Sequence, residues 1–121
     1  MTSAVLMTIE AQRVDGGVRK LRPDPDRRIS RTEAGERCNP PVKRGTVMGY
    51  NQLAINHLKK YREAFYVWQE GKRVINLELP IPETHLPVIQ AIREEFHRSR
   101  RASAVTAWIK NNKDYLESLL P

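Results

Sequence analysis

Residues 86–120 read LPVIQAIREEFHRSRRASAVTAWIKNNKDYLESLL. Apolar residues recur every three or four positions on both sides of a basic centre, as along one face of an amphipathic helix. The two stripes contain Leu86, Ile89, Ile92 and Phe96, then Val105, Ile109, Asn112, Leu116 and Leu119. The pattern predicts two helices, with Thr84 and Ser103 as candidate N-caps. They are joined by residues 97–101, which we name the basic corner, and residues 111–112 are expected to kink or divide the second helix.

Residues 46–70 show the strongest helical period in the chain. Their apolar stripe consists of Val47, Tyr50, Ala54, Leu58, Tyr61, Phe65 and Trp68. Thr46 is a candidate N-cap, and Gly71 is a candidate C-terminal stop. Burial of the large side chains would contribute about 1.5–3 kcal/mol each. We therefore expect this helix to form the centre of the core.

The segment from Lys72 to Pro80 alternates apolar and polar residues, which predicts a short strand with Ile75, Leu77 and Leu79 facing the core. An isolated strand needs a partner. The only partner that the sequence predicts is a candidate β-hairpin at residues 5–22, because the residues Asp15-Gly16-Gly17 tolerate the positive φ of a tight turn. The alternative is an extended connector that packs on the helices.

Residues 22–45 have the composition of a linker. Four prolines interrupt the segment, and it contains seven basic and four acidic residues without an apolar period. Two interpretations are open: a solvated tether, or an extended arm that lies along a polyanion or a partner. The expected organisation is thus mainly α: an N-terminal arm at residues 1–45 and a small three-helix domain at residues 46–121, with one strand between its first two helices.

The composition points to an anionic partner. The chain has 121 residues, 21 Lys and Arg against 14 Asp and Glu, a formal net charge of +7 and a pI of about 9.9. Such a charge favours nucleic acid, an acidic protein surface or anionic lipid. The one cysteine, Cys38, excludes an internal disulfide, and no apolar run approaches the roughly 20 residues that span a bilayer. Since no signal peptide is recognisable either, we expect a cytoplasmic protein with no membrane partner.

The basic corner is the leading candidate for a functional site. Residues 89–116 can be overlaid on a helix-turn-helix, in which the start of the second helix enters the major groove. Small side chains there would allow close approach, while arginines hold phosphates. The candidate binding residues are Arg98, Arg100 and Arg101 at the corner; Lys59, Lys60, Arg62, Arg73 and Lys110 on helical faces; and Arg27, Arg28, Arg31, Lys43 and Arg44 on the arm. The alternative is an ordinary helical hairpin with a solvated corner.

Catalysis and metal binding find little support in the residues. No glycine-rich phosphate loop or nucleophile elbow is recognisable, and the three histidines and single cysteine lack the spacing of zinc ligands. We expect no enzyme, cofactor or metal. The hypothesis is a non-enzymatic nucleic-acid-binding protein, for DNA or RNA, in which Tyr66 beside basic residues is a candidate for stacking on an unpaired base. The alternative is a protein–protein adaptor or inhibitor, or a small subunit of a nucleoprotein complex, whose arm orders on binding.

Overall fold

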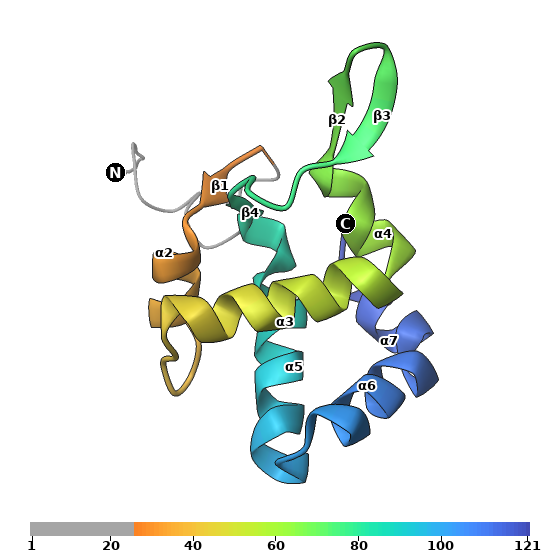
Figure 1. The fold of residues 1–121 in the computed structure, drawn as a ribbon. Coiled ribbons are helices and arrows are strands. Elements are labelled where there is room, and N and C mark those ends of the chain that lie inside the picture. The colour runs from red at the N-terminus through yellow and green to blue at the C-terminus, as the bar shows by residue number, and fades with distance from the viewer. Residues whose placement is uncertain (1–25) are drawn as a thin grey trace, which may run out of the picture.

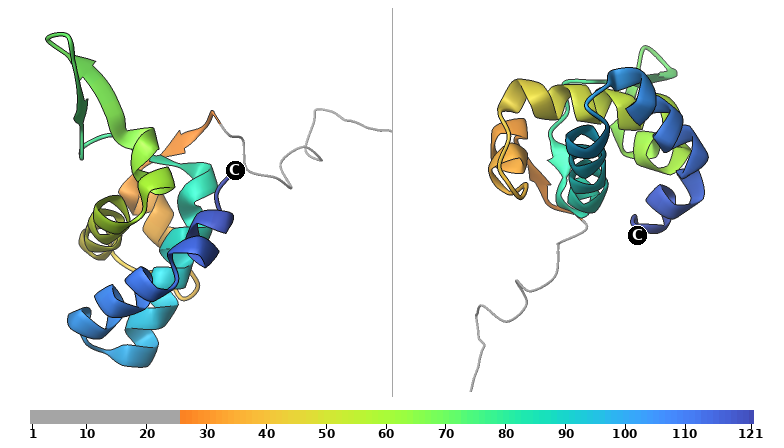
Figure 2. Two further views of the ribbon diagram at one scale, coloured as in Figure 1. Left: turned by 90° about the vertical axis from the view of Figure 1, so that its right-hand side faces the viewer. Right: turned by 90° about the horizontal axis from the view of Figure 1, so that it is seen from below.

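The computed structural model describes residues 26–121, which are mostly helical, as the sequence predicts (Figures 1 and 2). The α-helices of this part are α2 (Arg31–Glu36), α3 (Arg44–His57), α4 (Lys59–Arg62), α5 (Leu86–Ser99), α6 (Ala102–Asn111) and α7 (Lys113–Ser118). The strands and 3-10 turns are β1 (Arg28–Ile29), η2 (Glu63–Phe65), β2 (Tyr66–Gln69), β3 (Lys72–Ile75), β4 (Ile81–Pro82) and η3 (Glu83–His85). The candidate hairpin at residues 5–22 lies outside the described residues.

The long helical pattern at residues 46–70 forms the core but not a single helix. Its stripe from Val47 to Phe65 is buried, as expected. Leu58 has an extended backbone (φ −117°, ψ 109°) that separates α3 from α4. Trp68 differs from the prediction, because the chain enters a strand at Tyr66 and leaves the indole 76% exposed. The residues Tyr66-Val67-Trp68 suit a strand, since aromatic and β-branched side chains favour the pleated conformation.

The two helices predicted in residues 86–120 are present, and the second is divided. Pro87 lies in the first turn of α5, and only Arg100 and Arg101 separate α5 from α6. Asn112 divides α6 from α7, as expected, and its side-chain amide donates to the carbonyl of Trp108 at 2.8 Å. Ser103 does not cap α6, because the helix begins one residue earlier and Arg101 occupies the cap position without a side-chain hydrogen bond. The apolar stripes of α5, α6 and α7 pack with α3 in one core.

A hairpin of β2 and β3 projects from the helical body (Figure 1). Glu70 and Gly71 have φ values of 52° and 76°, as a two-residue turn with both central residues at positive φ requires. The predicted strand at residues 72–80 therefore pairs with its immediate neighbour β2 and ends at Ile75. Its expected orientation is wrong in part: Ile75 and Leu77 are 37% and 44% exposed, whereas Leu79 packs against the core.

The described part of the predicted arm belongs to the folded body. β1 pairs antiparallel with β4, with Ile29 opposite Ile81. The hydroxyl of Ser30 caps α2 by accepting the backbone N–H of Glu33 at 3.0 Å. Ile29 and Ala34 are buried in a small cluster with Val47 and Ile81, and Cys38 joins the main core. The reading as a solvated tether is thus wrong for residues 28–38. The buried apolar residues of this segment occur singly, without a helical or strand period, so the sequence pattern did not predict their burial.

Candidate nucleic-acid interface

At the basic corner, Arg98 is held by a carboxylate and the next two arginines are not. Arg98 donates to Oε1 of Glu95 through Nε at 3.0 Å and Nη2 at 2.8 Å. Ser99 Oγ donates to the other oxygen of Glu95 at 2.6 Å. These hydrogen bonds, from Ser99 first and Arg98 second, hold the pKa of Glu95 below its usual value. Arg100 and Arg101 are exposed, and neither forms an ion pair within residues 26–121.

Arg100 occupies a backbone position that suits glycine. Its φ of 62° and ψ of 16° are left-handed, and its N–H donates to the carbonyl of Phe96, which ends α5. Glycine is the usual residue at such a helix end, and a left-handed conformation costs an L-residue about 1 kcal/mol. A strained position that keeps an exposed arginine suggests a use for its side chain.

A second group of basic residues lies where α3 ends, α6 ends and α7 begins. It consists of His57, Lys110 and Lys113, and we name it the lysine cluster. Both lysines are exposed and lie near enough to His57 to act on it electrostatically. Partial burial first, and then the charges of Lys110 and Lys113, lower the pKa of His57. Of these three residues the sequence predicted only Lys110, because no single helical period joins residue 57 to residue 110.

The helix α6 connects the basic corner with the lysine cluster (Figure 1). A helix of ten residues spans about 15 Å. Ser103, Ala107 and Lys110 are exposed at positions i, i+4 and i+7, so they share one outer face of α6. Between the two basic ends this face carries the small side chains of Ser103 and Ala107. Asp114, on α7 beside Lys113, is the acidic residue next to this face along the chain. Exposed basic residues thus lie at both ends of α6, with exposed small side chains between them.

Most of the other predicted cations are engaged within the molecule. Two arginines bind carboxylates: Arg27 pairs with Glu83 at 3.0 Å and with Glu33 at 3.3 Å, and Arg73 pairs with Glu63 at 2.6 Å. Four others donate to backbone carbonyls, and these are Arg28 to Pro80 and Ala64, Arg31 to Leu77, Arg62 to Ile55, and Lys60 to Leu120. Lys43, Arg44 and Lys59 are exposed and form no ion pair in the described part. The first two lie where α3 begins, and Lys59 lies on α4.

The predicted binding residues lie at separate places in the fold. Arg27 and Arg28 lie beside β4 and η3, where α5 begins, whereas the basic corner follows the end of α5. The 14 residues of α5 separate these ends by about 21 Å. Lys43 and Arg44 are likewise separated from the lysine cluster by the length of α3 (Figure 1). The corner and Lys110 thus lie along α6, while the arginines of the predicted arm do not.

Glu83 has a central role that the sequence did not predict. Its carboxylate is nearly buried and accepts from Arg37 Nη1 at 2.5 Å and from Arg27 Nη1 at 3.0 Å. A buried carboxylate needs such partners, because its desolvation would otherwise be costly. The two arginines precede Glu83 by 46 and 56 residues, and no local pattern joins residues so far apart. This cluster fastens α2 and the segment before β1 to the start of α5.

The described residues offer no arrangement for metal chemistry. No group of three or more His, Cys, Asp or Glu side chains in this part could hold a metal ion. Cys38 is buried, and burial raises the pKa of its thiol while the charge of Arg93 opposes the rise.

None of the helices in residues 26–121 combines the length and the apolar character that a bilayer crossing requires.

Comparisons with protein-family models, with curated proteins and with solved structures find no match for this chain.

Proposed function

We propose that this chain is a non-enzymatic nucleic-acid-binding protein that holds the phosphate backbone along α6. One observation carries the proposal. The exposed Arg100 and Arg101 at one end of α6, and Lys110 and Lys113 at the other, have no carboxylate partner within the described residues, whereas Arg27 and Arg73 are paired with glutamates. Because no carboxylate neutralises them, these side chains at the two ends of α6 can interact with an external polyanion at full charge.

The dimensions of α6 suit a phosphate backbone. Duplex DNA carries one negative charge per about 1.7 Å of its axis, so a helix of about 15 Å faces several phosphates. The planar guanidinium groups of Arg100 and Arg101 can form two-point contacts with phosphate oxygens, and the lysines act as point charges. Each contact releases condensed counterions, which makes the binding strongly dependent on salt.

The short connection between α5 and α6 supports binding in the manner of a helix-turn-helix, with few contacts that distinguish one base sequence from another. In such a placement the start of α6 would enter the major groove. The exposed residues there are Ala102 and Ser103, whose small side chains offer few hydrogen bonds to base edges. We therefore infer binding that depends mainly on phosphates and tolerates many sequences, on DNA or RNA.

Fluorescence anisotropy with labelled duplex DNA and duplex RNA tests the proposal at 50 to 200 mM salt. The double variants Arg100→Ala/Arg101→Ala and Lys110→Ala/Lys113→Ala should each weaken binding about tenfold or more at low salt. Each should also reduce the slope of log affinity against log salt by about 2, because two phosphate contacts are lost. Lys43→Ala/Arg44→Ala removes the same charge from the start of α3, and its smaller effect measures the contribution of net charge alone.

Two results would contradict the proposal. If the wild-type chain binds no probe at 50 mM salt, the function is wrong, and the alternative of a protein–protein adaptor or inhibitor takes its place. If the three double variants weaken binding equally, net charge rather than the α6 surface accounts for the affinity.

A further inference from the structure

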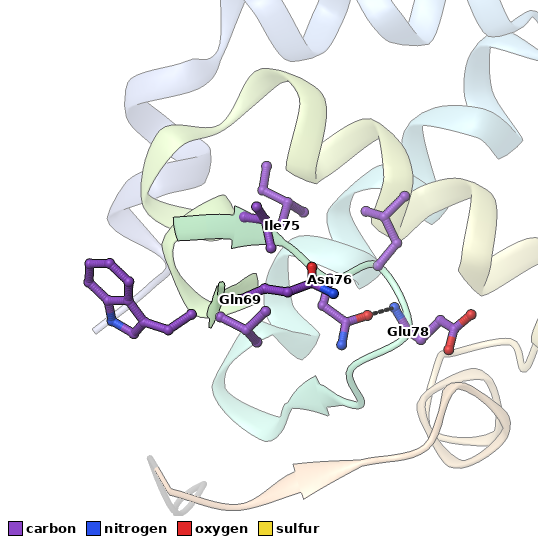
Figure 3. A pocket seen from close by; sticks show the side chains of 8 residues that line it. Gln69, Ile75, Asn76 and Glu78 are labelled. Carbon is purple, nitrogen blue, oxygen red and sulfur yellow. Dashed lines mark hydrogen bonds between the residues drawn. The ribbon is translucent and has the colours of Figure 1, made fainter. Parts of the chain in front are cut away.

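The hairpin β2–β3 has no third strand beside it within residues 26–121. In Figures 1 and 2 it projects from the helical body, and no helix covers it. Its base is firmly held. The Asn76 N–H donates to the carbonyl of Phe65 at 2.8 Å, and Asn76 Oδ1 accepts the backbone N–H of Glu78 at 2.9 Å (Figure 3). The hairpin is thus anchored to the body, while its outer strand edges face solvent.

The outer edge of β2 presents backbone groups without partners. Along an antiparallel ladder every second pair is hydrogen-bonded, and the count starts here from the bonded pair at the base. Trp68 and Arg73 form one of the pairs without such bonds. The backbone N–H and C=O of Trp68 therefore point away from β3, and so does the carbonyl of Tyr66. Within residues 26–121 none of these groups bonds to another segment, so this edge is a template for a further strand.

The side chains distinguish the edge of β2 from that of β3. β3 begins with the exposed cations Lys72 and Arg73, and charged residues on an edge strand oppose its pairing with a second copy. The strand β2, Tyr66–Gln69, carries no charge. Trp68 is 76% exposed, so its indole contributes little to the core of one chain. The edge of β2 is therefore the one that favours pairing.

The strand β2 is complementary to a second copy of itself. In an antiparallel pair centred on Val67, Tyr66 of each copy lies opposite Trp68 of the other, and the Trp68 N–H meets the Tyr66 carbonyl. A two-fold axis generates this aromatic pair twice, and aromatic cross-strand pairs stabilise a sheet. The guanidinium of Arg73 lies over the Tyr66 ring at 4.0 Å and holds it in place.

The ends of this pairing are complementary in charge. The register brings the exposed Glu70, at the turn of one copy, opposite Ala64 of the other. The carbonyl of Ala64 accepts a hydrogen bond from Arg28, so a guanidinium already lies at this place. The neighbouring Glu63 is neutralised by Arg73 at 2.6 Å. A carboxylate of each copy thus approaches an arginine of the other.

We propose that the outer edge of β2 binds β2 of a second copy of this chain, in a four-stranded antiparallel sheet with its two-fold axis at Val67. The inference goes beyond the proposed function and does not rest on it. One short strand from each copy forms a small interface, below the roughly 1,200 Å² of stable complexes, so the dimer should be weak and reversible.

Sedimentation equilibrium of the full chain, after nuclease treatment, tests the proposal from low micromolar to sub-millimolar concentration. The wild-type chain should approach twice its mass of 14.0 kDa reversibly. Trp68→Lys should weaken association about tenfold or more, because the dimer loses two aromatic pairs and gains two lysines near its axis. The matched control is Ile75→Lys, which adds the same charge to the outer strand β3 at a side chain that is 37% exposed. It should leave the association constant unchanged.

Cysteine cross-linking tests the register. Val67→Cys should form a disulfide across the axis under mild oxidation, because residues of a non-hydrogen-bonded pair lie about 4.5 Å apart between Cα atoms, which a disulfide can span. Val74→Cys is the matched control. Val74 is half-buried like Val67 and lies opposite it in the hairpin, but on the outer strand, so this variant should stay reduced. The wild-type chain, whose thiol at Cys38 is buried, gives the background.

Three results would overturn the inference. These are a chain that stays monomeric over the whole concentration range, a dimer that Trp68→Lys leaves intact, and equal disulfide yields from Val67→Cys and Val74→Cys. Circular dichroism of each variant establishes that it is folded. Because the samples contain no nucleic acid, these results leave the proposed function to the anisotropy measurements on the α6 variants.

Discussion

The guanidinium of Arg98 contacts a single oxygen of Glu95 through two nitrogens, at 2.8 and 3.0 Å. The pair divides the basic corner into a compensated arginine and two uncompensated ones, Arg100 and Arg101. Glu95 is 8% exposed, so its charge would be costly without Arg98 and Ser99. The corner is therefore less cationic than its sequence suggests, and the carboxylate of Glu95 limits what it offers to a polyanion.

Replacement of this carboxylate should strengthen binding and weaken the fold. In Glu95→Gln the charge of Arg98 becomes available, and we expect nucleic-acid affinity at low salt to rise several-fold. The lost charge-assisted hydrogen bonds should lower the free energy of unfolding by about 1–3 kcal/mol. Anisotropy titrations and urea denaturation measure the two effects. Glu94→Gln, which removes an exposed carboxylate one residue earlier, provides the control for charge alone. If Glu95→Gln leaves the affinity unchanged or lowers it, Arg98 is not adjacent to the bound phosphates.

Arg100→Gly should change stability and binding in opposite directions. Glycine adopts the left-handed conformation of this position without strain, so the free energy of unfolding should rise by up to about 1 kcal/mol. The affinity for nucleic acid should fall, because one unpaired guanidinium is lost. Thermal denaturation and anisotropy measure the pair of effects, and Arg101→Gly serves as the comparison because Arg101 has an extended backbone at φ −140°. Stability that falls in Arg100→Gly would show that the arginine side chain supports the fold.

The folded protein should lose stability as the pH falls through the range set by His85. The ring is nearly buried against Tyr61, with centroids 4.3 Å apart, and Nε2 bonds the carbonyl of Tyr61 at 3.2 Å. Burial lowers the pKa of His85 from 6.5 to about 4. Above pH 6.5 the ring is neutral in both states. Between pH 6.5 and 4 the unfolded chain binds the proton first, so the free energy of unfolding should decrease, by about 3 kcal/mol in total.

Urea denaturation at half-unit pH intervals measures this dependence, and His85→Phe keeps an aromatic ring at the position while removing the titration. The slope between pH 6.5 and 4.5 should be smaller in this variant. His57, whose pKa is also lowered, is removed from the comparison by a parallel His57→Gln background. Equal slopes with and without His85 would mean that the folded protein accommodates a protonated ring at residue 85.

Loss of the Glu83 carboxylate should detach the N-terminal segment from the start of α5. Glu83→Ala leaves Arg27 and Arg37 without their nearly buried acceptor. Because both arginines are partly exposed to solvent, we expect the free energy of unfolding to fall by only about 2 kcal/mol. Hydrogen exchange should increase most in β1 and α2. The matched control is Glu63→Ala, which removes the exposed pair with Arg73 and should cost at most about 1 kcal/mol. Similar losses in the two variants would assign Glu83 the role of an ordinary surface carboxylate.

Local patterns in the chain determined the helices of the C-terminal half. Between Leu86 and Leu119 an apolar residue recurs about once per helical turn, so the sequence alone predicts α5 and α6. The residues Asn111 and Asn112 likewise predict the division of the second helix. The same helical period marks the stripe from Val47 to Phe65, which is buried. The prediction for Trp68 is wrong. The 3.6-residue period extends to Trp68 in the sequence, but the helix is interrupted at Leu58 and the chain enters a strand at Tyr66.

The tertiary structure alone decided which charged residues are available. The sequence supplies a net charge of +7 and a list of arginines, but a cation is neutralised or left free by residues far along the chain. Glu83 compensates Arg27 from a distance of 56 residues, whereas His57 and Lys110 meet only because α3 and α6 end at the same place. Local periodicity reports the contacts of residues three and four apart. Within the candidate interface along α6, the sequence already indicated Arg100, Arg101 and Lys110, whereas only the tertiary structure places His57 beside Lys110 and Lys113.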